Sequence, residues 1–423
     1  MQQDGRFTSD QRKITVFCMV AYSILYFMRL NVSLALEDMM IAFQASPESM
    51  GAITSAFFWC YAFGQLVFGF LGDRLPVRFM VFTGLLGSGI LNLAIGLSPA
   101  FCFAFESPVF PIVIFWALNG VFQSMLWSPI VKCVAANFEG NKKVIVSFAL
   151  SITQVIGYIL AWVGSYFLRE YINWQFVFLV PAILGILFSL IWVFRFRFSS
   201  VVTEVRSKKG PSLIRQPALL SFLGVIALFS ILFGLVKSSI DTWLPTMIGD
   251  VGGLAEGGIV ITLLLIPMVN FAGIMLSKTM VKKLRGDIYK TILLIWGGAV
   301  IISAIALFMF NFNPIVFVVF VAVLFGFVYS QTPLFTSFIP LDFVKWDCVS
   351  TVTGFVDFAI YLGAGVTGII SGKILGDESN MNWSGLSTYW LVILAVGMVF
   401  AITVYFWHHA LRKKISREEA EWD

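Results

Sequence analysis

The chain alternates between long apolar segments and short polar interruptions. Each apolar segment is long enough to cross the ~30 Å hydrocarbon core of a bilayer as a helix. This pattern predicts an all-α membrane protein with twelve transmembrane helices. The segments lie at residues 14–36, 50–71, 79–99, 109–136, 144–168, 174–195, 218–248, 257–281, 289–310, 314–338, 349–374 and 386–409.

The longest polar interruption, residues 195–216, divides these segments into two sets of six. It is rich in bases and contains a Gly-Pro pair, as is typical of a linker. We therefore expect an N-terminal six-helix bundle at 1–197, a cytoplasmic linker at 198–216, a C-terminal six-helix bundle at 217–410 and a cytoplasmic tail at 411–423.

Composition and charge agree with a membrane protein. Hydrophobic residues make up 59% of the chain and charged residues 12%, against about 25% charged residues in a soluble protein. With both termini placed in the cytoplasm, most of the 28 Lys and Arg residues fall on the cytoplasmic side. Arg169 and Lys373 fall outside. The positive-inside rule therefore favours this orientation.

Two cations interrupt the apolar segments themselves. Arg29 lies in the first segment of one half and Lys237 in the first segment of the other. A charge at bilayer depth costs roughly 3 kcal/mol on insertion scales, so it usually has a function. The paired positions predict an anion site on a pseudo-twofold axis. An Arg held by a structural acid or by helix-end carbonyls is the alternative.

The residues around Arg29 suit an oxyanion. Tyr22 and Tyr26 precede it at helical spacing and share its face, and Asn31 follows. A guanidinium presents a planar fork that forms paired hydrogen bonds to phosphate or carboxylate.

Two acids lie near these predicted sites. Asp241 follows Lys237 by four residues, so an intrahelical ion pair is an alternative to substrate binding. Asp357 lies in the middle of segment 349–374. It is a candidate for carrying a coupling proton, for balancing Arg29 or Lys237, or for binding a substrate ammonium, and a structural role is equally open.

Several amides also lie in apolar segments, where such groups more often join helices than touch substrate. We expect Gln123, Gln154 and Gln331 to be better site candidates than Asn92, Asn119 and Asn270.

The turn after the second segment combines small residues with charges. Gly69 and Gly72 permit close helix packing, and Asp73 is followed by the bases Arg74 and Arg78. Asp73 can accept hydrogen bonds from a neighbouring helix end or pair with a base. An ordinary basic cytoplasmic loop is the alternative. The counterpart in the second half, 277–285, keeps the bases and lacks the acid.

Motifs of soluble enzymes are missing from the sequence. It contains neither GxxxxGK[ST] nor HExxH, and its two His residues are adjacent, His408 and His409. Five Cys residues are widely spaced without a CxxC pair. We expect no enzyme activity, no cofactor and no metal site. The basic tail is expected to contact anionic lipid rather than nucleic acid.

Three segments together resemble the organophosphate:phosphate antiporter family of the major facilitator superfamily, which includes glycerol-3-phosphate and hexose-phosphate transporters. They are Tyr26-Phe-Met-Arg29-Leu-Asn31, Asn119-Gly-Val-Phe-Gln123-Ser-Met-Leu-Trp127-Ser-Pro129 and Lys237-Ser-Ser-Ile-Asp-Thr-Trp243-Leu-Pro245. The turn at Asp73 and the segment from Gly354 to Gly363 support the match. The resemblance implies two pseudo-symmetric six-helix bundles in the major facilitator fold.

The resemblance also implies roles, with informative departures. The family's two midplane arginines correspond to Arg29 and, with a change to Lys, to Lys237. Leu30 stands where the glycerol-phosphate type has a second base, and Thr153 where that type has a His. Asp357 adds a negative charge at a usually small position. A monoanion or zwitterion therefore becomes more plausible than a dianionic phosphate.

The sequence thus predicts a secondary transporter of a small organic anion or zwitterion. Organophosphate exchange for phosphate is the first hypothesis, proton symport of a carboxylate or amino-acid-like solute the second, and a membrane sensor of a sugar phosphate the third. The protein is expected to be a monomer in a bacterial inner membrane, contacting lipid, with a proton or phosphate as counter-ion. Further substrate contacts are expected from Tyr22, Tyr26, Gln123, Thr153, Trp162, Gln331 and Tyr361.

Overall fold

The computed structural model describes residues 7–45, 47–195, 217–251, 258–375 and 381–420. Every regular element within these ranges is helical, which confirms the predicted all-α fold. The expected linker at 198–216 lies outside the described residues. The expected tail is helical through Ala420, because α17 continues to that residue.

The chain forms two compact units. Unit 1 comprises Met1–Gly210, Leu263–Pro267 and Pro340–Phe358, and unit 2 comprises Pro211–Thr262, Met268–Ile339 and Ala359–Asp423. Unit 1 thus takes in two short stretches from the second half of the sequence, and the second of them includes the first residues of α16.

The helices of the first half follow the predicted segments. They are α1 (Ser9–Leu30), α2 (Val32–Phe43), α3 (Pro47–Gly72), α4 (Val77–Gly96), α5 (Val109–Gln123), α6 (Trp127–Asn137), α7 (Gly140–Ile159), α8 (Ser165–Tyr171) and α9 (Phe176–Arg195). Two short 3-10 turns, η1 (Ser98–Ala100) and η2 (Cys102–Ala104), follow α4, and the π-helical turn η3 (Leu160–Gly164) joins α7 to α8.

The second half is built in the same way. Its helices are α11 (Pro217–Asp250), α12 (Gly258–Lys283), α13 (Ile288–Met309), α14 (Pro314–Tyr329), α15 (Ile339–Leu341), α16 (Val349–Leu375) and α17 (Trp383–Ala420). The π-helical turn η5 (Leu334–Phe338) precedes α15, and the 3-10 turn η6 (Val344–Trp346) precedes α16.

Eleven helical segments of the described chain are long and apolar enough to cross a membrane. They match eleven of the twelve predicted segments. The remaining prediction, 257–281, coincides with α12, whose first side chains lie outside the described set.

Helix ends coincide with capping residues. Thr8 begins α1 through a reciprocal capping box, in which its hydroxyl accepts from the Gln11 N–H and the Gln11 side chain accepts from the Thr8 N–H, both at 3.2 Å. Asp287 accepts from the Lys290 N–H at the start of α13. Asn313 caps α14, whose first residue is Pro314. These caps determine the residue at which each helix begins, which hydropathy alone does not predict.

Four predicted segments are interrupted rather than continuous. The first breaks at Asn31 between α1 and α2, the fourth at 124–126 between α5 and α6, the fifth at the π-helical turn η3, and the tenth at 330–333 between α14 and η5. Hydropathy does not register such breaks because apolar residues continue on both sides of them. π-Helical turns inside helices often mark functional sites.

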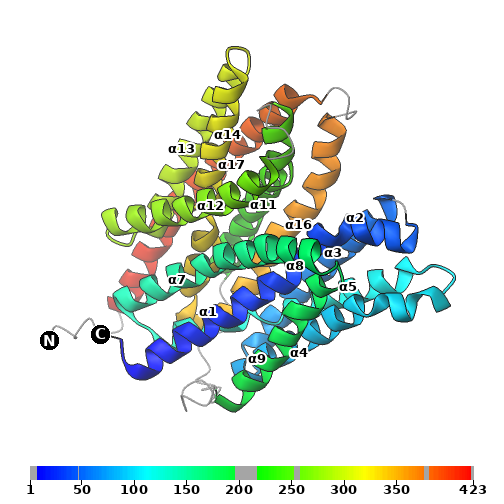
Figure 1. The fold of residues 1–423 in the computed structure, drawn as a ribbon. Helices are drawn as coiled ribbons and strands as arrows, with labels where there is room; N and C mark the ends of the chain where they lie inside the picture. Colours follow the sequence, from blue (N-terminus) through cyan, green and yellow to red (C-terminus); the bar gives the residue numbers. More distant parts are fainter. Residues whose placement is uncertain (1–6, 46, 196–216, 252–257, 376–380, 421–423) are drawn as a thin grey trace. The chain divides into compact units, whose positions relative to one another are not determined.

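Within unit 1, α1 lies beside α7 and α9, α3 beside α5, and α4 beside α9 (Figure 1). Close approach relies on glycine at particular places. A Cβ at Gly120 of α5 would lie 2.6 Å from the Phe57 carbonyl oxygen of α3. Through this packing, the buried face of α1 lies against its neighbouring helices α7 and α9.

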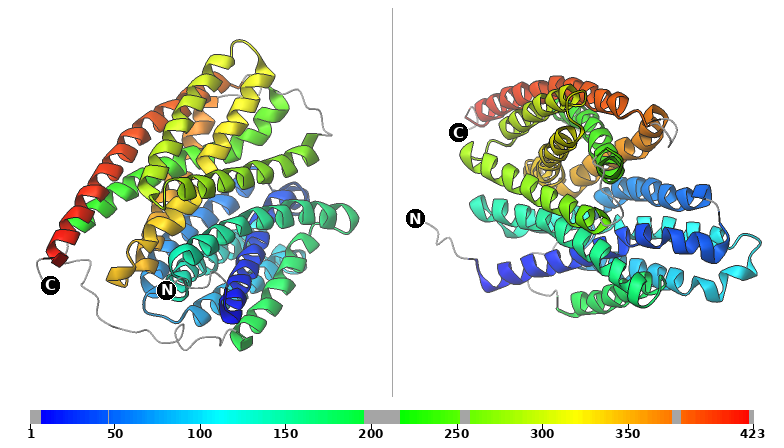
Figure 2. Two further views of the ribbon diagram at one scale, coloured as in Figure 1. Left: turned by 90° about the vertical axis from the view of Figure 1, so that its left-hand side faces the viewer. Right: turned by 45° about the horizontal axis from the view of Figure 1, so that its top comes forward.

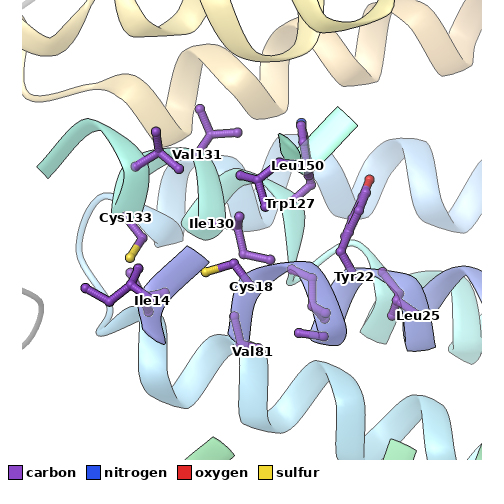
Figure 3. Close-up of a cluster of buried hydrophobic side chains, with 14 of the residues drawn as sticks. Ile14, Cys18, Tyr22, Leu25, Val81, Trp127, Ile130, Val131, Cys133 and Leu150 are labelled. Atoms are coloured by element: carbon purple, nitrogen blue, oxygen red, sulfur yellow. The ribbon is translucent and has the colours of Figure 1, made fainter. Parts of the chain in front are cut away.

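An apolar cluster holds the first turns of α1 in place. Ile14, Cys18 and Tyr22 of α1 are buried together with side chains of α4, α6 and α7 (Figure 3). Trp127 is the largest of the neighbouring α6 side chains, and its ring lies 4.5 Å from that of Tyr22. The cluster continues along α1 as far as Met28, and it therefore anchors the helix up to the residue before Arg29.

Within unit 2, α13 lies beside α14 and α17, and α11 beside α17 and α14 (Figure 2). Trp296 of α13 donates to the Leu394 carbonyl at 2.8 Å, and Trp390 of α17 donates to Ser239 Oγ of α11 at 2.9 Å. Buried indole N–H groups thus find partners across neighbouring helices.

Candidate functional site

Arg29 is buried near the end of α1, with 6% of its surface exposed. Its Nε donates to Gln123 Oε1 of α5 at 2.9 Å. Its guanidinium lies 4.2 Å from the ring centroid of Tyr61 and 4.9 Å from that of Tyr26. Aromatic faces attract a cation within about 6 Å. The hydrogen bond from Nε and the aromatic rings on two helices thus orient the guanidinium.

The predicted aromatic residues of the first half lie in one chain of ring contacts. Tyr22 contacts Tyr26 at 5.2 Å, Tyr26 contacts Tyr158 at 5.8 Å, and Tyr158 contacts Trp162 at 4.9 Å. Trp162 lies in the π-helical turn η3. The structure therefore brings Tyr22, Tyr26 and Trp162 together on the side of α1 that carries Arg29, and adds Tyr158.

Tyr61 is a residue that the sequence reasoning missed. It is buried on α3, beneath the Arg29 guanidinium, and its hydroxyl accepts from Gln65 Nε2 at 2.6 Å. Gln65 Oε1 in turn accepts from Ser128 Oγ at 3.2 Å. The spacing of Tyr61 and Gln65, four residues apart within an apolar helix, was the available signal.

Gln123 and Thr153 differ in their surroundings. Gln123 is fully buried and bonded to Arg29. Thr153 is also fully buried, and its hydroxyl donates to the Leu150 carbonyl of its own helix. Its carbonyl accepts from Ser23 Oγ of α1 at 3.5 Å. Thr153 therefore helps to join α7 to α1, next to the turn that carries Tyr26.

Asp357 lies in the part of α16 that belongs to unit 1 and is 3% exposed. It interacts electrostatically with Arg29. Gly354, one turn earlier, approaches α3 so closely that a Cβ there would lie 2.6 Å from the Gly69 Cα. This contact holds the Asp357 turn against the helix that carries Tyr61. Arg29, one of the partners considered for Asp357, lies in the same unit.

The other predicted site residues of the second half lie in unit 2. Lys237 of α11 has its Nζ 5.0 Å from the ring centroid of Tyr329. Asp241 lies one turn further along the same helix. Gln331 is buried and donates to the Ile292 carbonyl at 3.2 Å. Tyr361 of α16 is half-buried. Tyr329 is a further aromatic partner that sequence reasoning did not single out.

Asp73 begins the turn after α3 and contacts the start of α16. Its Oδ1 accepts from the Ser350 N–H at 2.9 Å, and its Oδ2 accepts from the Thr351 N–H at 2.7 Å and from the Thr351 hydroxyl. A carboxylate suits a helix N-terminus because N–H groups and the helix dipole both favour negative charge there. Asp73 thus accepts from a neighbouring helix end, the first of the two interactions considered.

Burial raises the pKa of Asp73 above its ordinary value, against the opposing effects of its bonds to Thr351 and Ser350 and of the nearby Lys132 charge. Lys132 of α6 donates to the carbonyls of Gly72 at 3.0 Å and Asp73 at 2.7 Å. A cation at these last carbonyls stabilises the C-terminus of α3. Lys132 is a cation at this turn that sequence reasoning did not place there.

The remaining residues of the turn have separate partners. Arg74 lies 3.7 Å over the Phe70 ring, and Arg78 donates through Nε to the Val193 carbonyl of α9 at 2.7 Å. A Cβ at Gly69 would lie 2.7 Å from the Gly354 Cα, and one at Gly72 would clash with Ser350 Oγ. Both glycines therefore permit the approach of α16 that brings Ser350 to Asp73.

The known proteins that are similar to this chain include transporters of phosphate esters and a membrane sensor. A probable hexose phosphate transport protein of Chlamydia muridarum is 26% identical over 42% of this chain and 37% of its own length. A glycerol-3-phosphate transporter of Bacillus subtilis is 27% identical over 45% and 42%. The membrane sensor protein UhpC of Salmonella typhimurium is 20% identical over 93% and 91%. The first two matches span less than half the length of those relatives.

A solved structure and a family model also match this chain over most of its length. The MFS transporter FucP in its outward conformation superposes with a TM-score of 0.71 at 15% identity, covering 94% of this chain and 99% of that one. The Major Facilitator Superfamily model matches residues 17–368, which is most of the chain. The protein therefore belongs to the major facilitator superfamily.

Proposed function

We propose that this protein is a secondary transporter that moves a small organic anion across the membrane by alternating access, with phosphate esters as its first substrate class. The observation that carries the proposal is Arg29, a guanidinium buried in an apolar helix and oriented by Gln123 and two tyrosine rings. Relatives named as hexose phosphate and glycerol-3-phosphate transporters support the choice of substrate class.

Arg29 would bind the anionic group directly. Arginine forms paired hydrogen bonds with phosphate and carboxylate oxygens, and such bonds are strongest where water is excluded. Tyr22, Tyr26, Thr153 and Trp162 are proposed to contact the rest of the substrate in unit 1, and Gln331 and Tyr361 to do so in unit 2.

Lys237 is proposed as the second cation. It occupies the first long helix of the second half, as Arg29 does in the first, and transporters of this kind use corresponding elements of their repeats. As a point charge without a fork it would bind an anion less selectively than Arg29. Asp241, one turn away, is proposed to balance its charge when no substrate is bound.

A counterflow assay tests the phosphate exchange. Purified protein in liposomes loaded with inorganic phosphate should take up glucose 6-phosphate faster than in phosphate-free liposomes. A protonophore should leave that uptake unchanged, because phosphate exchange needs no proton gradient. Uptake independent of internal phosphate and abolished by the protonophore would reject exchange.

Proton symport of a carboxylate or zwitterion is the second candidate, and the electrostatic interaction of buried Asp357 with Arg29 favours it. Asp357 would carry the coupling proton. Asp357→Asn should then abolish uphill accumulation and leave exchange of internal for external substrate intact. Equal loss of accumulation and exchange would count against a coupling role.

A sensor function is the third candidate, because the match to the membrane sensor protein UhpC spans 91% of that relative. A sensor would bind a sugar phosphate without moving it. Saturable binding of glucose 6-phosphate by the purified protein, together with no flux in liposomes and co-purification of a cytoplasmic partner, would favour the sensor over the transporter.

We propose a bacterial inner membrane as the location, with both termini in the cytoplasm and a monomer as the functional unit. The basic residues on the expected cytoplasmic side support this orientation. A proton or phosphate is the proposed counter-ion, and no enzymatic step is proposed.

A further inference from the structure

The chain interrupts its first helix two residues after Arg29. Asn31 lies between α1 and α2, and its side-chain oxygen accepts from the Val32 N–H at 3.0 Å. In an uninterrupted helix that N–H would bond the carbonyl four residues earlier, at Met28. The break therefore affects the carbonyl immediately before Arg29.

The Met28 carbonyl instead receives amide side chains from two other helices. Asn92 of α4 donates to it at 3.3 Å, Asn119 of α5 at 3.2 Å and Gln123 of α5 at 3.1 Å. All three amides are fully buried. Without water at this depth, a carbonyl released from its helix is costly unless side chains replace its lost partner.

The amides are also bonded to one another. Ser88 Oγ of α4 donates to Asn119 Oδ1, and Gln123 Nε2 donates to Ser88 Oγ at 3.1 Å. Asn31 Nδ2 donates to Asn92 Oδ1 at 3.0 Å. We call Asn31, Ser88, Asn92, Asn119 and Gln123 the amide network. It ties the helix break to α4 and α5.

Gln123 is the member that reaches Arg29. The guanidinium Nε–H can only donate and the Met28 carbonyl can only accept, so the amide orientation of Gln123 is dictated by its neighbours. Its oxygen must face Arg29 Nε and its nitrogen must face the carbonyl. One side chain thus connects the guanidinium to the backbone of the preceding residue.

This connection determines the orientation of the guanidinium group. A guanidinium held at Nε and stacked on Tyr61 cannot rotate about its last bonds without losing that hydrogen bond. Its Nη edge, which forms the end-on fork for an oxyanion, is then directed in one fixed orientation. Ordering it in advance lowers the entropy cost of binding.

We propose that Gln123 is a positioning residue for Arg29: it orients the guanidinium for the substrate anion through the amide network and does not itself contact the substrate. The inference rests on the proposed anion-binding role of Arg29. It differs from the expectation that Gln123 is a substrate contact, and from a purely structural role in joining α5 to α1.

Spectroscopy of the resting protein tests the inference without transport. In protein labelled with [15N]arginine, the Arg29 Nε–H should give a slowly exchanging signal, identified by its loss in Arg29→Lys. Gln123→Ala should shift this signal and speed its exchange with solvent by about tenfold or more. That factor corresponds to the free energy of one hydrogen bond to a charged group. Asn270→Ala removes another fully buried amide, in unit 2, and should leave it unchanged.

Transport kinetics then separate positioning from packing. Gln123→Ala should raise the half-saturation concentration for inorganic phosphate by about tenfold and leave the maximal rate within about twofold. The Arg29→Lys variant lacks Nε. In that background, Gln123→Ala should raise the half-saturation concentration for inorganic phosphate by less than about a further twofold.

Two results would overturn the inference. One is an Arg29 Nε–H signal that is unaltered in Gln123→Ala, and the other is an equal effect of Gln123→Ala in the wild type and in the Arg29→Lys variant. If the wild type neither binds nor transports phosphate or its esters, the proposed function fails instead. The spectroscopic comparison still decides the role of Gln123 in that case.

Discussion

At the scale of single residues, the protein places charge in an apolar helix by surrounding it with partners of limited strength. Arg29 lies on the rings of Tyr61 and Tyr26 and bonds to a neutral amide. Aromatic faces and amide oxygens stabilise a cation without themselves carrying a negative charge. Asp357 of α16 interacts electrostatically with this cation.

Tyr61 is expected to act through its aromatic face. Tyr61→Leu should raise the half-saturation concentration for substrate about fivefold to thirtyfold, because a cation–π interaction at a desolvated site contributes about 1–2 kcal/mol. Tyr61→Phe keeps the ring and loses only the hydrogen bond to Gln65. It should therefore raise the half-saturation concentration less than Tyr61→Leu does. Uptake kinetics in liposomes measure both, and a larger effect of Tyr61→Phe than of Tyr61→Leu would contradict the aromatic role.

Asp73 predicts a pH dependence of stability. Its pKa is raised in the folded protein, so the folded state binds this proton more tightly than the unfolded chain. Its contribution to stability is therefore fully present below the ordinary value of 3.8 and is lost as pH rises through the raised pKa. The Tm of the wild type minus that of Asp73→Asn should fall as pH rises from 4 toward 7.

Thermal unfolding in detergent across this pH range measures the difference. A difference that grows with pH would mean that the hydrogen bonds from Ser350 and Thr351 outweigh burial in setting the pKa of Asp73.

At the scale of elements, close approach between helix backbones decides which residues meet. Gly354 of α16 lies against Gln65 and Gly69 of α3, and this approach brings Ser350 to Asp73 on one side and Asp357 toward Arg29 on the other. Glycine is needed because the atoms that face the missing Cβ belong to the backbone and cannot move aside.

Gly354→Ala should therefore destabilise the protein by about 1–3 kcal/mol, as overpacking in a close-packed interior does. Gly372→Ala is the matched control, since it lies in the same helix and a Cβ there would have no neighbour within 4 Å. It should be neutral or stabilising by up to about 1 kcal/mol. Chemical or thermal unfolding in detergent measures both, and equal losses would contradict the close approach.

The elements also show what sequence could and could not supply. Length and hydropathy predicted the helical segments because every spanning helix needs about 20 apolar residues. The break at Asn31 and the π-helical turn η3 were not predictable in this way, because apolar residues continue through both. Tyr61 and Lys132 were missed because their roles depend on contacts with α1 and α3 that lie far away in sequence.

At the scale of the whole molecule, membership of the major facilitator superfamily and the distribution of charge support one orientation in the membrane. With the expected twelve spans, most bases outside the spans fall on the side of the Asp73 turn, which we propose to be cytoplasmic. Single cysteines placed at residue 2 or residue 420, in a variant with its natural Cys residues replaced, should react with a membrane-impermeant maleimide in inverted vesicles. Labelling in intact cells instead would reverse the proposed orientation.

The central claim is that Arg29 binds the anionic group of a transported substrate. The most direct measurement is uptake of glucose 6-phosphate by liposomes loaded with inorganic phosphate, with wild type, Arg29→Lys and Arg29→Ala compared at equal reconstitution and Gly372→Ala as a folding control. We predict loss of at least about 99% of uptake in Arg29→Ala and partial retention in Arg29→Lys, since removing one partner of a desolvated charge pair costs about 3–5 kcal/mol. Uptake by Arg29→Ala at the wild-type rate would contradict the account.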